Sequence, residues 1–176
     1  MTWSGSLVCH ELLPGHHFHL ATQSENESLQ AFREKYSVGA YTEDWTEYAA
    51  SPEIEMEMYE TPEELSGRYI GEMFLASRLV VDTGMNYLGW SLEEAGEYMR
   101  QYFIQSDAEI ASETLRYSTS IPARALAYRL GYEKMSELRT RTEAALGEAL
   151  DVRVFHDIVL SDGAKSLVVL ESKVER

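Results

Sequence analysis

The sequence has a single cysteine, no long apolar run and no cluster of basic residues, and each absence excludes a class of protein. Cys9 stands alone among 176 residues, so no internal disulfide can form and nothing requires an oxidising compartment. No run of about 18 apolar residues is available for a membrane span. The first residues, MTWSGSLV, lack the basic start and apolar stretch of a secretion signal. We therefore expect a cytoplasmic protein without a membrane partner.

The charge is strongly acidic, with 30 acidic against 15 basic residues and a net charge of -15. An acidic chain without a basic patch has no electrostatic footprint for nucleic acid, so we expect no nucleic-acid partner. The hydrophobic content is 44% and the aromatic content 11%, which is typical of a globular protein with a core. With no linker visible, we expect a single domain over residues 1–176.

Helix signals account for most of the chain. Capping boxes are legible in TPEE (61–64), SLEE (91–94) and SDAE (106–109), where a Thr or Ser is followed three residues later by Glu. Apolar residues recur at helical spacing behind each of them. The segment from Leu65 to Val81 is apolar nearly all round, which is typical of a buried central helix.

The rest of the chain continues the helical series. We expect a long helix from near Pro122 towards Gly147, and a short one capped by Asp151 and stopped at Gly163. The last segment, KSLVVLESKV, fits a helix or a strand, and we favour a helix because the other elements are helical. Residues 24–35 are polar and expected to be exposed, and 51–60 are expected to form a loop or a short acidic helix. The predicted fold class is all-α.

The stretch CHELLPGHHFH (9–19) holds four of the five histidines. It resembles the zinc-protease pattern HExxH, except that Pro14 stands where the second histidine would be. A catalytic zinc ion usually takes three protein ligands and a water molecule, whose pKa it lowers to about 7. His10 and Glu11 have the residue types and the order of a ligand and a general base.

The second ligand is ambiguous by geometry alone. On a regular helix, His16 lies roughly 240° round from His10, whereas His17 returns to the same face about 10 Å further along. Pro14 and Gly15 are expected to deform the helix at this point. Such a bend can rotate either His16 or His17 towards His10, so both remain candidates.

A third ligand is available in YTEDWTEYAA (41–50), where Glu43 and Glu47 lie one turn apart on one helix face. The alternative interpretation is that these acids are exposed on an amphipathic helix and that the histidines are scattered over a solvated one. Spaced histidines without a strict HExxH pattern do not decide between the two.

Four motifs in order resemble a bacterial family known as domain of unknown function 885, whose members look like zinc metallopeptidases of the gluzincin type. HELLPGHH (10–17) matches the family pattern HExxPGHH, and TEDWTEY (42–48) matches TEGW followed by tyrosine, with Asp44 in place of glycine. RLVVDTGMNYLGW (78–90) matches RLVVDTGxHxxGW, and RYSTSIPARALAYRLG (116–131) is close to RYxxxPGQALxYxxG. The series spans most of the chain.

The resemblance implies one zinc ion per chain, bound by His10, His16 and Glu43, with His17 as the alternative second histidine. Glu11 would be the general base. The implied activity is hydrolysis of a peptide or small amide substrate through a metal-activated water.

The third and fourth motifs add candidates around the ligands. Arg78, Asp82 and Asn86 follow at four-residue spacing on one helix face, and we expect Arg78 and Asp82 to pair with each other near the ligand shell, together with Glu47. Asn86 replaces the family's histidine, which keeps a hydrogen-bond donor for catalysis but loses a titrating group.

The fourth motif contributes Tyr117 and Tyr128, whose hydroxyls are candidates for stabilising an oxyanion in the cleft. Arg124 replaces the family's glutamine and would change the charge of the pocket.

Family members carry a long helical region before the histidine motif, but here only nine residues precede His10. We expect either a missing N-terminal region or a partner chain, which a homo-oligomer would supply through exposed apolar faces. The alternative function is a non-catalytic metal-binding or interaction domain without a complete cleft.

Overall fold

The computed structural model describes residues 4–51, 56 and 58–175, and these residues contain helices but no strand. The elements are α1 (Ser4–Glu11), α2 (His16–Ser24), α3 (Ala31–Glu34), α4 (Gly39–Ala50), α5 (Pro62–Asn86), α6 (Leu92–Tyr102), α7 (Asp107–Leu115), the π-helical turn η2 (Arg116–Ser120), α8 (Arg124–Leu146), the 3-10 turn η3 (Gly147–Ala149), α9 (Val152–Leu160) and α10 (Leu167–Val174). The all-α prediction is confirmed. Within this part of the chain, no helix is both long and apolar enough to cross a bilayer.

The predicted helix starts are found where the capping boxes placed them. Thr61, Ser91 and Ser106 each accept a hydrogen bond from the backbone of the glutamate three residues on, and that glutamate binds back to the cap. Asp151 caps α9 by accepting from the backbone N–H of Arg153. The caps work as predicted because their hydrogen bonds are local and do not depend on the tertiary fold.

Other segments also match their expectations. Residues 24–35 are largely exposed and contain the short α3. The C-terminal segment is the helix α10, not a strand. The stretch 51–60 lies partly outside the described residues, which omit 52–55 and 57, and residues 1–3 of the first segment are also outside them.

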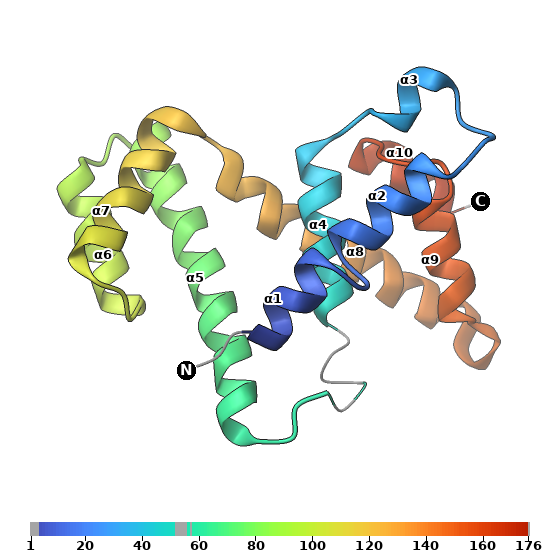
Figure 1. Ribbon diagram of the computed structural model, residues 1–176, viewed down its shortest axis with the longest axis horizontal. Coiled ribbons are helices and arrows are strands. Elements are labelled where there is room, and N and C mark those ends of the chain that lie inside the picture. The colour runs from blue at the N-terminus through green and yellow to red at the C-terminus, as the bar shows by residue number, and fades with distance from the viewer. Residues whose placement is uncertain (1–3, 52–55, 57, 176) are drawn as a thin grey trace.

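Two apolar clusters form the core, and both include residues of helix α8. Figure 1 shows α8 running from the group of α5, α6 and α7 to the group of α9 and α10. The first joins α4 to the C-terminal half of α8, α9 and α10, with Tyr41, Trp45, Tyr48, Met135, Leu138, Phe155, Val159, Leu160 and Leu170. The second joins α5, α6, α7, η2 and the start of α8, with Val81, Ala95, Met99, Ile110, Tyr117 and Ala125. Because α8 contributes to both clusters, it holds them together.

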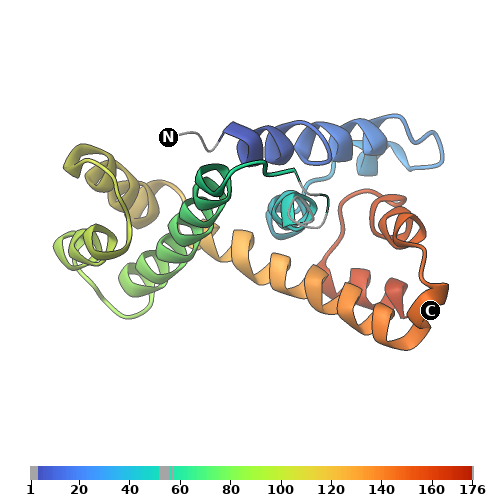
Figure 2. The ribbon, with the colours of Figure 1, turned by 90° about the horizontal axis from the view of Figure 1, so that it is seen from below.

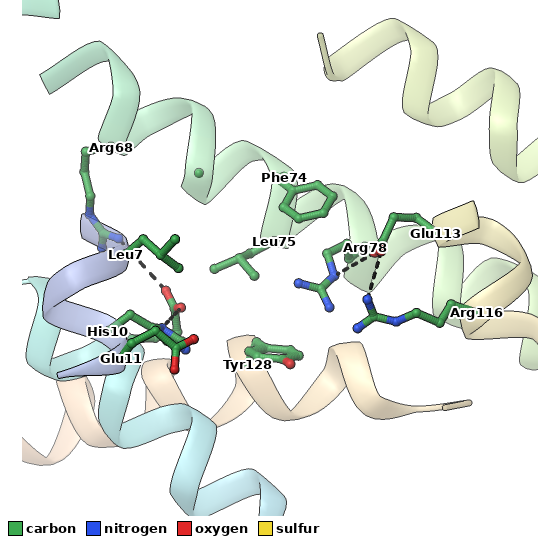
Figure 3. A pocket seen from close by; sticks show the side chains of 12 residues that line it. Leu7, His10, Glu11, Arg68, Phe74, Leu75, Arg78, Glu113, Arg116 and Tyr128 are labelled. Carbon is green, nitrogen blue, oxygen red and sulfur yellow. Dashed lines mark hydrogen bonds and ion pairs between the residues drawn. The ribbon is translucent and has the colours of Figure 1, made fainter. Parts of the chain in front are cut away.

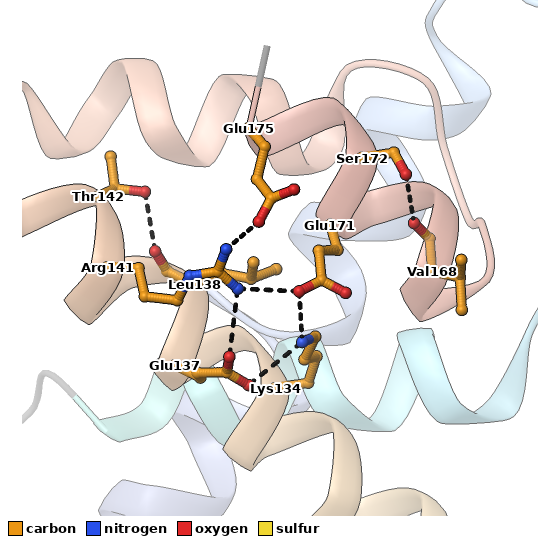
Figure 4. Close-up of polar contacts among 9 residues, drawn as sticks. All are labelled: Lys134, Glu137, Leu138, Arg141, Thr142, Val168, Glu171, Ser172 and Glu175. Carbon is orange, nitrogen blue, oxygen red and sulfur yellow. Dashed lines mark hydrogen bonds and ion pairs between the residues drawn. The ribbon is translucent and has the colours of Figure 1, made fainter. Parts of the chain in front are cut away.

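Helix α10 is fixed to α8 by ion pairs as well as by the buried Leu170 (Figure 4). Glu171 Oε1 accepts from Lys134 Nζ at 2.8 Å and from Arg141 Nη1 at 2.9 Å, and Arg141 also binds Glu175. Exposed pairs of this kind contribute about 1 kcal/mol or less each, so the burial of Leu170 is the larger contribution to docking.

Helix α5 is less buried than predicted. Tyr69 is 52% exposed and Met73 41% exposed, although both lie in the stretch expected to be covered on all sides. Its buried positions are largely small or charged residues, namely Gly67, Arg68, Ser77, Arg78, Val81, Asp82 and Gly84. Figure 2 shows why: α5 leans away from α4 and packs with α6, η2 and α8, so one side of it has no neighbour in the described chain.

Candidate metal centre

A bend separates α1 from α2 within the histidine motif. Helix α1 ends at Glu11 and α2 begins at His16, and the turn between them contains a cis Leu13–Pro14 peptide bond. A Cβ atom on Gly15 would lie 1.8 Å from the carbonyl oxygen of His10, so only glycine fits there. The carbonyl of Pro14 accepts a hydrogen bond from Trp45 Nε1 at 2.9 Å, which fixes the bend to α4.

The bend brings His16, and not His17, to His10. The two imidazole rings lie 4.9 Å apart between centroids and are nearly perpendicular, at 85°. Glu43 Oε2 lies 3.4 Å from His16 Nε2 and 3.9 Å from His10 Nε2. His17 is exposed and takes no part in the cluster.

The three side chains converge closely enough to hold one metal ion. One ligand atom from each of His10, His16 and Glu43 lies within 4.8 Å of the others. Zinc bonds of about 2.0–2.1 Å in a tetrahedron separate ligand atoms by roughly 3.3 Å, so small side-chain movements suffice to meet a zinc ion. The donor set and its spacing therefore fit such a group.

Glu47 orients the first histidine from behind. His10 Nδ1 lies 2.9 Å from Glu47 Oε1, which leaves His10 Nε2 directed at the cluster. A carboxylate on the far nitrogen of a ligating histidine fixes its tautomer and strengthens it as a ligand. Burial by itself lowers the pKa of His10, but the hydrogen bond and charge of Glu47, with the charges of Glu11 and Glu43, outweigh burial and raise that pKa.

Glu43 has one oxygen free for a metal because the other is taken. Arg124 Nη2 lies 2.5 Å from Glu43 Oε1, while Glu43 Oε2 faces the histidines. Burial raises the pKa of Glu43, but His16 and Arg124 together lower it below its usual value, which keeps the carboxylate ionised. The arginine that replaces a glutamine in the fourth motif is thus bonded directly to a predicted ligand.

Next to the cluster, a cavity of about 240 Å³ runs between α1 and α5 (Figure 3). Glu11, the candidate general base, is exposed and lines the cavity beside His10. Tyr128 of α8 also lines the cavity, between the end at His10 and the end at Arg78. The remaining lining residues are Leu7, Glu47, Arg68, Gly71, Phe74, Leu75, Arg78, Glu113 and Arg116.

The expected pair between Arg78 and Asp82 is wrong. Asp82 accepts from the backbone N–H groups of Ala123, at 2.8 Å, and Ala125, at 3.0 Å, so it caps the start of α8 from a neighbouring helix. Arg78 turns instead towards η2, where its Nε atom binds the Tyr117 hydroxyl. The sequence spacing placed Arg78 and Asp82 on one face correctly, but α8 supplies Asp82 with better-placed donors.

The expected catalytic roles of Asn86 and Tyr117 are not supported by their positions. Asn86 Nδ2 donates to Asp82 Oδ1 at 2.8 Å and to the Tyr117 carbonyl at 3.0 Å, and Asn86 does not line the cavity. The Tyr117 hydroxyl donates to Glu113 Oε2 at 2.6 Å and accepts from Arg78, and its side chain is fully buried. Both residues stabilise the packing of α5 on η2.

Sequence reasoning missed Arg68, Glu113 and Arg116. Arg68 lies 4.0 Å from Glu47 Oε2, and Glu113 lies between Arg78 and Arg116 at the other end of the cavity. One signal was present: Arg68 and Arg78 are ten residues apart, which places them within about a quarter turn of each other on a helix. Arg116 also begins the fourth family motif, but nothing in the local sequence of α7 or η2 indicated that they would meet this face.

Asp44, which stands where the family motif has glycine, is fully buried beside the candidate ligand Glu43. It packs so closely on α8 that a Cβ atom on Gly131 would lie 1.0 Å from its Oδ2 atom. Its two oxygens form no regular hydrogen bond within the described residues. Burial raises the pKa of Asp44 to about 8.

Two solved structures share the fold of this chain. One is the "putative lipoprotein" of Colwellia psychrerythraea, with 37% identity and a TM-score of 0.93 over 97% of this chain and 29% of that one. The other, with 22% identity and a TM-score of 0.86, is a "putative lipoprotein of unknown function" from Shewanella oneidensis, matched over 97% of this chain and 31% of that one. No curated protein matches the sequence.

The expected cytoplasmic location is wrong in the light of these relatives, whose descriptions point to an exported or membrane-anchored protein. The expectation rested on the lack of a signal in the first residues. The chain spans only 29% and 31% of the two relatives, so its first residues carry no information about a leader.

The family resemblance drawn from the four motifs is confirmed by a match that covers nearly the whole chain. The family model described as "Bacterial protein of unknown function (DUF885)" matches residues 2–174. The fold, the 37% identity to a solved relative and this match agree. This chain belongs to the DUF885 family of bacterial proteins.

Proposed function

We propose that this chain carries the metal centre of a zinc-dependent, gluzincin-like hydrolase that cleaves peptide or small amide substrates. The observation that carries the proposal is the convergence of His10, His16 and Glu43 within 4.8 Å, with Glu47 hydrogen-bonded behind His10. Two histidine nitrogens and one carboxylate oxygen form a donor set typical of catalytic zinc, because it leaves a fourth position for water.

The residues around the cluster have distinct tasks in this proposal. A zinc ion, when bound, would supply an acidic water and polarise the substrate carbonyl. Glu11 accepts the proton of the attacking water and passes it to the leaving nitrogen. Glu47 orients His10, and Arg124 holds Glu43 so that a single oxygen faces the centre.

The complete enzyme would need more than this chain. The chain spans less than a third of the two solved relatives. We infer that the rest of a longer protein, or a second copy, forms the other wall of the cleft. The likeness to proteins described as lipoproteins supports an exported or membrane-anchored location for that protein.

Metal analysis tests the proposal directly. Protein purified without chelators should contain about one zinc ion per chain by mass spectrometry, and a His10→Ala variant should contain none. A chain that contains no zinc and does not bind added zinc contradicts the ligand assignment.

A non-catalytic metal-binding domain is the second candidate, favoured by the ion pair between Arg124 and Glu43. The positive charge of Arg124 reduces the negative charge that the Glu43 carboxylate offers to a metal ion. This alternative would be supported by a chain that binds zinc but cleaves nothing in a peptide library, even as part of the longer protein or oligomer that forms the other wall of the cleft.

A further inference from the structure

The end of the cavity opposite His10 is a cationic site in a strongly acidic chain (Figure 3). Arg78 and Arg116 both line it, and Glu113 is the acidic residue between them. Arg78 Nε lies 3.6 Å from Glu113 Oε2, and Arg116 Nη1 lies 3.0 Å from Glu113 Oε1. Two guanidinium groups share one carboxylate, so this end has a net charge of +1 while the whole chain has -15.

Arg78 is held rigidly, with its terminal nitrogens directed into the cavity. Its side chain is 9% exposed, and the guanidinium lies against the rings of Phe74, Tyr117 and Tyr128 at 4.8 to 5.1 Å. The hydrogen bond found for Arg78 in the described chain uses Nε, on the side away from the cavity. The two terminal nitrogens therefore present the planar donor pair that matches a carboxylate.

We propose that this arginine end binds the free C-terminal carboxylate of a short peptide. The inference rests on the proposed function, since it places the amide to be cleaved at the histidine end. It specifies the substrate class: peptides cut near a free carboxyl terminus. A carboxylate is favoured over a phosphate because Glu113 already neutralises one of the two cations, leaving a single positive charge.

The length and lining of the cavity set the size of the substrate. Arg68, beside Glu47, and Arg78 are ten residues apart on α5, which corresponds to about 15 Å of helix. An extended peptide rises about 3.3–3.6 Å per residue, so about four residues span the cleft. Leu7, Phe74 and Leu75 lie between the two ends and favour an apolar side chain in the middle.

Binding calorimetry tests this site without any turnover. The zinc-loaded Glu11→Gln chain is titrated with N-acetyl-Ala-Leu-Ala, with its C-terminal amide, and with N-acetyl-Ala-Leu-Glu amide. Hydrogen bonds to charged groups contribute enough for the free acid to bind about tenfold tighter than the Ala amide, or more. If the Glu amide binds as tightly as the free acid, the site recognises a side-chain carboxylate and the assignment to a C-terminus is overturned.

Variants locate the effect. Arg116→Ala, at a half-exposed position, and Arg78→Lys, which keeps the charge but loses the fork, should each reduce the preference for the free acid over the amide several-fold. Arg100→Ala is the matched control, because Arg100 is ion-paired with Asp107 and lies outside the cavity. Circular dichroism verifies that each variant is folded.

The outcomes separate this inference from the proposed function. Equal binding of acid and amide, no binding of either at millimolar concentration, or an unchanged preference in Arg116→Ala overturns the carboxylate site. A clear acid preference, together with no peptide hydrolysis even when the chain is part of the longer protein or oligomer that completes the cleft, keeps the site and rejects the hydrolase proposal instead.

Discussion

The two ends of the cleft differ in how their polar side chains are brought together. At the histidine end, His10 and His16 come from one short motif and meet glutamates of a neighbouring helix that follows soon in the chain. At the arginine end, Arg78 meets Glu113 and Arg116, which lie more than thirty residues further along. A single motif and the helix that follows it therefore indicate the first end. Arg78 and Arg116 each begin a family motif, but they meet only because α5 packs on η2.

The difference also concerns their chemistry. The histidine end gathers donors that suit a cation, and the arginine end gathers donors that suit an anion. If each end acts as proposed, changes at one should affect metal binding or turnover and changes at the other should affect recognition of the substrate. The arginine variants described above test one side of that division. Of the five substitutions that follow, three test the histidine end, and those at Asp44 and Asn86 test stability outside the two ends.

The largest effect is expected from Glu11→Gln at the histidine end. Loss of a general base typically lowers turnover by about 10²–10⁴-fold, while zinc content should stay the same because Glu11 is not a ligand. Turnover is measured on a peptide library with the protein that includes the other wall of the cleft. Zinc content is measured separately by mass spectrometry. Retained turnover would remove Glu11 from the mechanism.

His16→Ala should weaken zinc binding by more than the roughly 100-fold upper range for residues that only support a ligand. His17→Ala is the matched control, since His17 is the next residue, is exposed and lies outside the cluster. Competition with a chromophoric chelator gives both affinities. A larger loss in His17→Ala would mean that the bend directs the other histidine to the metal.

Glu47→Gln should reduce zinc affinity by about 10–100-fold, because the neutral amide supports His10 less strongly than the carboxylate. Glu72→Gln is the matched control, because Glu72 pairs with Nη2 of Arg68 while Glu47 lies near its Nη1. It should leave zinc affinity unchanged. Equal losses in the two variants would show that only the overall charge matters.

Asp44→Ala should raise the free energy of unfolding by about 1–3 kcal/mol at neutral pH, because it removes a buried carboxyl group without a regular partner. The pKa of Asp44 is about 8 when folded, above its ordinary value of 3.8, so the folded state holds this proton more tightly. The native chain should therefore lose stability as pH rises from about 4 to 8. Urea titrations across that range should show a smaller loss in Asp44→Ala.

The smallest effect is expected from Asn86→Ala, which belongs to neither end. Loss of its hydrogen bonds to Asp82 and the Tyr117 carbonyl should cost about 1 kcal/mol of stability. Zinc affinity and turnover should not change. A drop in turnover with normal stability would restore the catalytic role expected from the family motif.

Local signals predicted much of the fold and part of the site. The capping boxes at Thr61, Ser91 and Ser106 placed three helix starts, because each is closed by hydrogen bonds within four residues. Burial was predicted less well for α5, since its apolar residues say which side chains avoid water but not which neighbour covers them.

The sequence by itself determined the all-α fold, the identity of the candidate donors and the presence of a bend at Pro14 and Gly15, because these depend on backbone sterics and side-chain chemistry. Only the tertiary structure decided that His16 and not His17 faces His10. The angle of the bend depends on where Trp45 holds the Pro14 carbonyl, and Trp45 is placed by the packing of α4. The tertiary structure also decided that Arg78 binds Tyr117, because that partner depends on the packing of η2 beside α5.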